Sequence, residues 1–131
     1  MPEAPLAQIT ITDHRRSKEW GRVDACFSDA LPQRCPNCMG PLQRHGTRPI
    51  VLADIPEDGR TVRIMLSRPR MRCAACGHIH LPCPAWLDTR HRATTRLIAL
   101  IQHSENLSLR ALATQTGLSP STIRRIREDS A

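Results

Sequence analysis

The chain has 131 residues with three aromatic side chains (two tryptophans and one phenylalanine), six cysteines and a formal net charge of +7 at pH 7. A small domain with so thin an aliphatic core usually depends on disulfides or a bound metal for its stability. The sequence lacks a long apolar run and a secretory signal, which excludes a membrane-spanning helix and predicts a cytoplasmic protein with reduced thiols. The positive charge favours a polyanionic partner, although a surface of solvated arginines would give the same sum.

Extended segments are expected in the N-terminal half of the chain. Apolar and polar residues alternate in 9–12 and 22–27, which predicts two short strands. Two further stretches, 47–55 and 61–67, flank Asp58-Gly59, a dipeptide typical of tight hairpin turns. We therefore expect a β-hairpin with one cysteine pair before it and the other after it.

The two cysteine pairs have the spacing of a zinc site. Cys35 and Cys38 form one C-x2-C motif, and Cys73 and Cys76 form the other. A gap of two residues lets both thiolates of a pair face one ion, and two pairs complete the tetrahedral sulfur set that Zn²⁺ prefers. The sequence therefore predicts one structural Zn²⁺ ion with these four ligands. A catalytic ion is not expected, because four thiolates leave no position for water.

Other uses of the cysteines fit the pattern less well. A redox C-x-x-C motif needs a single pair in a βαβ context, and structural disulfides conflict with a reducing compartment. Cys26 and Cys83 lie outside the set of four and are predicted to be small buried apolar residues. His78 and His80 follow the second pair and are alternative ligands, although beside a complete cysteine set we expect them at the surface.

Helical periodicity dominates the C-terminal part of the chain. Apolar residues recur at helical spacing in 93–104, and 108–127 contains two further helical patterns broken at Gly117. Gly117 should turn the chain at positive φ, Ser119 should cap the next helix, and Pro120 suits its first position. This pattern is typical of a helix-turn-helix. The alternative is a plain three-helix bundle whose arginines are only solvated.

The last of these helices should expose a basic face. Ile123 and Ile126 would point inward, and at 100° per residue the side chains opposite them face solvent. Arginine suits bidentate contacts to guanine, serine and threonine can contact bases or phosphates, and residues on the flanks favour phosphates. The predicted DNA-binding residues are Ser121, Thr122, Arg124, Arg125 and Arg127.

These patterns together predict an α+β protein, in which a small zinc-ribbon-like β module precedes a three-helix helix-turn-helix bundle. The predicted division assigns 1–30 to an N-terminal tail with short strands, 31–84 to the zinc-ribbon-like module and 88–131 to the helix-turn-helix module. No set of nucleophile and base stands out, so no catalytic residue is predicted.

The order of the motifs resembles the N-terminal region of insertion-sequence transposases of the ISL3 type, in which a zinc-finger module is followed by a helix-turn-helix. The matching residues are Cys35-Pro36-x-Cys38, Asp54-Ile55-Pro56, Arg70-Met71-Arg72-Cys73-x-x-Cys76-Gly77 and the segment 108–126. Two positions depart from the family pattern: Met39 stands where glycine is common, and His80-Leu81 where an aromatic residue is usual.

The resemblance implies a partner as well as a fold. The partner is double-stranded DNA, at the terminal inverted repeats of a mobile element. Transposases of this type continue into a catalytic domain, and this sequence ends at Ala131, so we expect a DNA-recognition head without transposition chemistry. The alternatives are a stand-alone transcriptional regulator and a zinc-stapled module that binds an acidic protein. The target sequence and the oligomeric state stay open, with a homodimer as one option.

Overall fold

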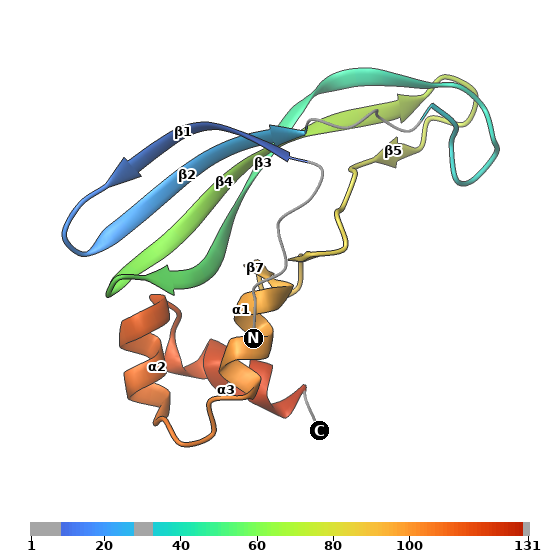
Figure 1. The fold of residues 1–131 in the computed structure, drawn as a ribbon. Coiled ribbons are helices and arrows are strands. Elements are labelled where there is room, and N and C mark those ends of the chain that lie inside the picture. Colours follow the sequence, from blue (N-terminus) through green and yellow to red (C-terminus); the bar gives the residue numbers. More distant parts are fainter. Residues whose placement is uncertain (1–8, 28–32, 130–131) are drawn as a thin grey trace.

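The computed structural model describes residues 9–27 and 33–129, and Figure 1 shows one curved sheet with three helices beneath one of its ends. The strands are β1 (Ile9–Arg16), β2 (Trp20–Phe27), β3 (Leu42–Glu57), β4 (Arg60–Cys73), β5 (Ile79–His80), β6 (Leu87–Asp88) and β7 (Ala93–Thr94). The helices are α1 (Thr95–Gln102), α2 (Leu109–Thr116) and α3 (Pro120–Glu128). This is the mixed α+β class that the sequence predicts. None of the helices in these ranges has the length and apolarity needed to cross a membrane.

β3 and β4 form the long antiparallel hairpin at the centre of the sheet, as predicted. Its turn consists of Asp58 and Gly59, with φ of 50° and 76°. Two positive φ values are the pattern of a type I′ turn, whose twist matches that of the flanking strands. The pairing continues to Leu42 opposite Cys73, well beyond the predicted strand ends. The hairpin therefore carries a cysteine at its open end.

The N-terminal strands extend the same sheet. β1 and β2 pair antiparallel, and β2 then runs parallel to β4 with Gly21 opposite Val62 and Ala25 opposite Leu66. The strand order is β1-β2-β4-β3-β7-β6, with β5 paired to β4. β1 and β2, which lie in the predicted N-terminal unit, thus share their sheet with the strands between the cysteine pairs.

Two apolar clusters stabilise the fold. In the first, Leu52, Ile64 and Leu66 on one face of the sheet pack with Ala25 and Leu87. The second joins the helices to the sheet and consists of Ala53, Ala93, Leu97, Ile101, Leu112, Ile123 and Ile126. Because Ala53 belongs to β3 and the others mostly to the helices, the helices pack directly on the sheet instead of being tethered by a linker.

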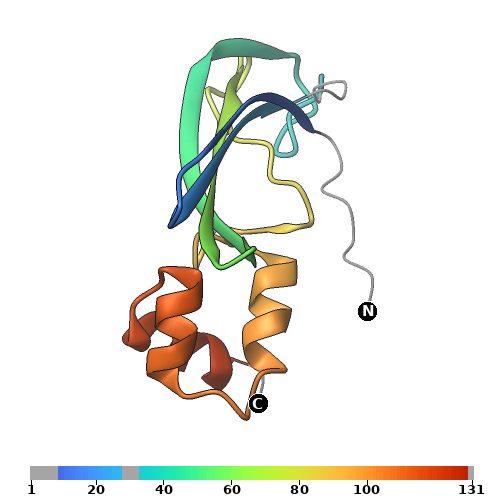
Figure 2. The same ribbon diagram turned by 60° about the vertical axis from the view of Figure 1, so that its left-hand side comes forward.

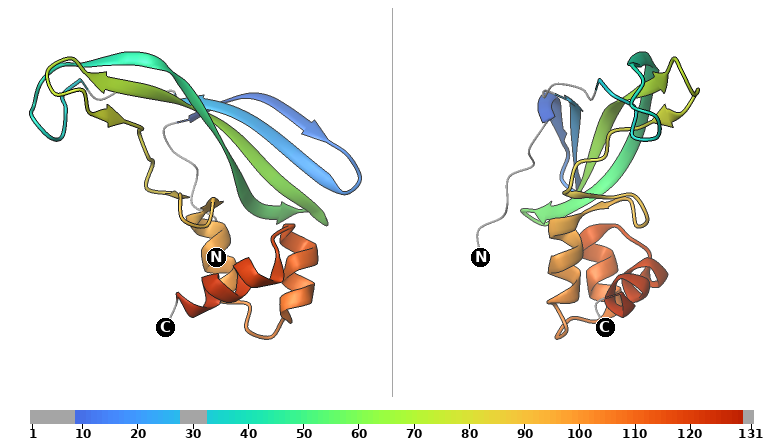
Figure 3. Two further views of the ribbon diagram at one scale, coloured as in Figure 1. Left: turned by 180° about the vertical axis from the view of Figure 1, so that it is seen from behind. Right: turned by 90° about the vertical axis from the view of Figure 1, so that its right-hand side faces the viewer.

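The cysteines and the helices lie at opposite ends of the hairpin. Figure 2 shows the helices below the turn of the hairpin, and the loops that carry the cysteines at the far end. Both views of Figure 3 show the same separation. A metal at the cysteine end would therefore act on the helices only through the sheet.

Candidate metal centre and nucleic-acid interface

Each cysteine pair sits in a tight turn, and the two turns have the same backbone geometry. In the first, the N–H of Met39 donates to the carbonyl of Cys35 at 2.9 Å; in the second, the N–H of Gly77 donates to the carbonyl of Cys73 at 2.9 Å. Met39 and Gly77 occupy equivalent positions with φ of 64° and 77°. Glycine adopts this conformation without strain and methionine does not, which explains why Met39 stands out against the family pattern.

The four sulfur atoms converge on one point. Their Sγ atoms all lie within 4.8 Å of one another. The Cys35–Cys76 and Cys38–Cys73 pairs are 3.7 and 3.4 Å apart. Four sulfurs bound to Zn²⁺ at about 2.3 Å would be separated from one another by about 3.8 Å. That separation lies between the shortest S···S distance here, 3.4 Å, and the upper limit of 4.8 Å. The four predicted ligands could therefore hold one metal ion.

Backbone amides further adapt these sulfurs to carry negative charge. The N–H groups of Asn37, Gly40 and Cys76 each point at a cysteine sulfur, with N···Sγ distances of 3.4 Å. Such hydrogen bonds favour the thiolate, which is the form that binds metal. Among the residues that the structure describes, His78 and His80 are not part of the cluster.

The pKa values of the Cys73 and Cys38 thiols are shifted in opposite directions. Hydrogen bonds, chiefly from the backbone N–H of Cys76 and also from the thiol of Cys38, lower the pKa of Cys73 to about 6. The N–H of Gly40 also lowers the pKa of Cys38, but hydrogen bonds with the thiols of Cys73 and Cys76 outweigh it and raise that pKa to about 12. The thiol of Cys73 therefore loses its proton readily, whereas that of Cys38 keeps its proton. Deprotonation of both requires a cation among the sulfurs.

Gly40 fits against this cluster and was not singled out from the sequence. A Cβ at this position would lie 3.0 Å from Cβ of Ala75, 3.1 Å from Sγ of Cys73 and 3.2 Å from Sγ of Cys38. At these distances a side chain would have to displace its neighbours by a few tenths of an ångström. The glycine therefore permits the two turns to approach closely enough for their sulfurs to meet.

The two remaining cysteines are separate from the cluster. Cys26 is partly buried and Cys83 is exposed, so the prediction that both are buried is wrong for Cys83. The thiol of Cys83 lies 3.7 Å from the carbonyl oxygen of Leu87, to which it donates. Residue type alone does not reveal whether a cysteine in a loop is exposed.

α2 and α3 are joined by the predicted turn. The side chain of Ser108 caps α2, Gly117 ends it with φ of 74°, and Ser119 caps α3 ahead of Pro120. Ile123 and Ile126 are fully buried in the helical core. The predicted glycine turn, serine cap and N-terminal proline are thus all confirmed.

The predicted DNA-binding residues fall into two groups. Ser121, Arg124 and Arg125 are exposed on α3, opposite its buried isoleucines. Thr122 is partly buried, and its hydroxyl lies 2.9 Å from that of Ser119 in the helix cap. The guanidinium of Arg127 donates to backbone carbonyls of the α1–α2 loop, at 2.8 Å to Ser104 and 2.6 Å to Leu107. Arg127 therefore holds a loop within the fold.

A side chain from β4 holds the turn between α2 and α3. Arg63 donates from Nη1 to the carbonyl of Thr116 and from Nη2 to that of Gly117, both at 3.0 Å. Burial lowers the pKa of Arg63, but the hydrogen bonds use its charged form. The orientation of α3 is consequently fixed relative to the sheet.

A buried ion pair makes a second connection, between β3 and α1. Asp54 is 4 % exposed, and its carboxylate accepts hydrogen bonds from the hydroxyl of Thr94 at 2.8 Å and from Nε of Arg96 at 2.9 Å. Nη2 of Arg96 completes a bidentate contact, and the hydroxyl of Thr94 also caps α1. A carboxylate among apolar residues of a strand was the only sequence signal for this contact.

The geometry defines a protein with two helices joined by a sharp turn, an exposed basic helix face and a separate four-cysteine centre. Residues 83–129 match the family described as the helix-turn-helix domain of transposase family ISL3. This segment is therefore an ISL3-type transposase helix-turn-helix region, as the motifs predict. The match does not include the cysteine pairs. No curated protein and no solved structure matches the chain.

Proposed function

We propose that the protein binds double-stranded DNA through the exposed face of α3. The observation that carries the proposal is the ISL3 helix-turn-helix match over a segment in which Arg124 and Arg125 are exposed opposite fully buried Ile123 and Ile126. In a helix-turn-helix, the second helix enters the major groove and its N-terminal part contacts base edges. Arginine can bind guanine there through two hydrogen bonds.

The four-cysteine centre is proposed to bind one Zn²⁺ ion. The support is the convergence of the four sulfurs and the amides that point at them. A bound Zn²⁺ would cross-link the two turns and leave no open coordination position. Its contribution would be to stability, by holding the open ends of β3 and β4 together.

The finer organisation is also part of the proposal. It comprises a zinc-ribbon-like module at 31–84, preceded by the unit at 1–30, and a three-helix helix-turn-helix bundle at 88–131. The DNA is proposed to be the terminal inverted repeats of a mobile element, bound by one or two copies of the chain in the cytoplasm. The family match identifies a DNA-binding domain and no catalytic domain, so the function proposed for these residues is recognition.

The local contacts assign different roles to the predicted DNA-binding residues. Arg124, Arg125 and Ser121 are free to contact bases or phosphates. Thr122 is proposed to contact a phosphate beside the start of α3, where the helix dipole favours an anion. For Arg127, the hydrogen bonds to Ser104 and Leu107 support an indirect role, in which it holds the loop that α3 packs against.

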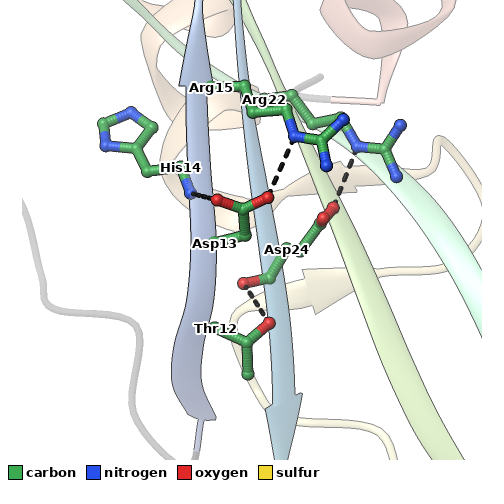
Figure 4. Close-up of polar contacts among 6 residues, drawn as sticks. All are labelled: Thr12, Asp13, His14, Arg15, Arg22 and Asp24. Carbon is green, nitrogen blue, oxygen red and sulfur yellow. Dashed lines mark hydrogen bonds and ion pairs between the residues drawn. The ribbon is translucent and has the colours of Figure 1, made fainter.

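Fluorescence anisotropy with a labelled mixed-sequence duplex tests the proposal. The wild-type protein should bind at low salt, and Arg124→Gln/Arg125→Gln should bind at least tenfold more weakly. The matched control is Arg15→Gln/Arg22→Gln, which removes the same charge from arginines that pair with Asp13 and Asp24 at 2.9 Å (Figure 4). Absence of wild-type binding at low salt would overturn the proposal in favour of a protein-interaction module. Equal losses in the two variants would show that charge alone acts.

A further inference from the structure

The half of the hairpin that lies away from the helices carries a row of arginines on one face. Successive residues of a strand point to opposite faces, so Arg68, Arg70 and Arg72 of β4 lie on the same face as the core residue Leu66. Arg48 of β3 is directly opposite Arg68 in the register of the hairpin. We refer to Arg48, Arg68, Arg70 and Arg72 as the arginine row.

The arginine row has no acidic counterpart. The segments 33–53 and 60–87, which include β4, all of β3 except its last four residues and both cysteine turns, contain no aspartate or glutamate. Within 9–27 and 33–129, the ion pairs involve β1, β2, the end of β3 next to the hairpin turn and the helical part, and none involves the arginine row. The Nε atoms of Arg68 and Arg70 are buried without a hydrogen-bond partner in this part of the chain.

Such an arrangement opposes folding in the absence of a ligand. Like charges that face each other on neighbouring strands repel, and the buried Nε atoms of Arg68 and Arg70 have lost hydration without gaining a hydrogen bond from the described residues. Arg68 is only 9 % exposed. Burial lowers the pKa of Arg68, the nearby Cys83 raises it, and the charge of Arg48 lowers it again. An anion at this position would relieve both the repulsion and the missing hydrogen bonds.

We propose that the arginine row binds phosphates of the DNA backbone, as a second contact in addition to α3. This inference rests on the proposed function, because its ligand is the same duplex. Guanidinium groups bind phosphate oxygens through paired hydrogen bonds. Arg63 holds the turn before α3 from the opposite face of β4. Counted along the strand, the row begins five and ends nine residues after Arg63, at about 16–30 Å. That distance lies within about one turn of B-DNA.

The salt dependence of DNA binding by the full chain tests this inference. Each phosphate contact adds about 0.9 to the slope of log K against log salt. The exposed members can be removed in Arg48→Gln/Arg72→Gln, which should reduce the magnitude of the slope by about 1.8, whereas Arg15→Gln/Arg22→Gln should leave it unchanged. If the wild type binds DNA and Arg48→Gln/Arg72→Gln has the same slope as the wild type, the proposed role of the arginine row is overturned and the proposed function is not. No wild-type binding at all would overturn the proposed function with it.

Arg68→Met separates binding from folding. If the row serves DNA, replacing this buried charge should weaken binding while the free protein unfolds at the same or a higher temperature. A lower unfolding temperature with unchanged DNA affinity would overturn the inference, since Arg68 would then be a structural residue. The inference would also be overturned if Arg48→Gln/Arg72→Gln lost bound metal while the salt dependence of its DNA binding stayed unaltered. The arginines would then balance the charge of the thiolates.

Discussion

Gly117→Ala should destabilise the protein by about 2.5–3.5 kcal/mol, and Arg63 should cause about half of this loss. An L residue at the φ of 74° observed here costs about 1–2 kcal/mol in backbone strain. The new Cβ would lie 2.8 Å from Nη2 of Arg63, so the guanidinium must move and release the carbonyl of Gly117. Losing a charged hydrogen bond costs about 1.5 kcal/mol at a partly exposed site.

A double-mutant cycle measures these two contributions separately. The free energy of unfolding in urea is determined, with metal bound, for wild type, Gly117→Ala, Arg63→Ala and the double variant. In the Arg63→Ala background the new methyl group meets no guanidinium, so Gly117→Ala should cost the backbone strain of about 1–2 kcal/mol and the tight contact with Cγ2 of Thr61 at 3.2 Å, which both backgrounds share. The coupling free energy should be about 1.5 kcal/mol. Equal costs of Gly117→Ala in both backgrounds would refute the assigned contact.

Two further predictions concern the cysteine end. Met39→Gly should stabilise the protein by up to about 1 kcal/mol, because it removes an L residue from φ of 64°. Gly77→Ala, at the equivalent position of the second turn, should destabilise it. Thermal unfolding checks both variants, and a lower Tm for Met39→Gly would contradict the assigned strain. A chelator should lower the Tm of the wild type and Zn²⁺ should restore it, whereas Cys38→Ser should be insensitive to chelator and Cys83→Ser should behave as the wild type. Unfolding curves that coincide with and without chelator would exclude a structural metal.

Local patterns predicted the parts of the fold that depend on neighbouring residues. Asp58-Gly59 specifies a two-residue turn because both positions need positive φ, and that requirement is visible in the sequence. Gly117 and Ser119 were predictable for the same reason, since a left-handed helix end and a cap each select particular residue types. The cysteine spacing likewise reported the geometry of a single knuckle.

Contacts between distant segments were not predictable in this way. The parallel pairing of β2 with β4 joins segments about forty residues apart and has no turn signature of its own. The side chain of Arg63 reaches the α2–α3 turn from the sheet, and that of Arg127 reaches back to the α1–α2 loop. On a helical wheel Arg127 lies on the flank of α3. Only the position of the α1–α2 loop shows that its guanidinium is hydrogen-bonded within the fold.

An NMR titration of the full chain with duplex DNA tests the central claim most directly. If α3 reads DNA, the largest shifts should be those of amides from Gly117 to Arg125, with a second set along the arginine row. The amides of β1 should stay unchanged. Shifts confined to β1 and β2, with α3 unaffected at saturating DNA, would contradict the account.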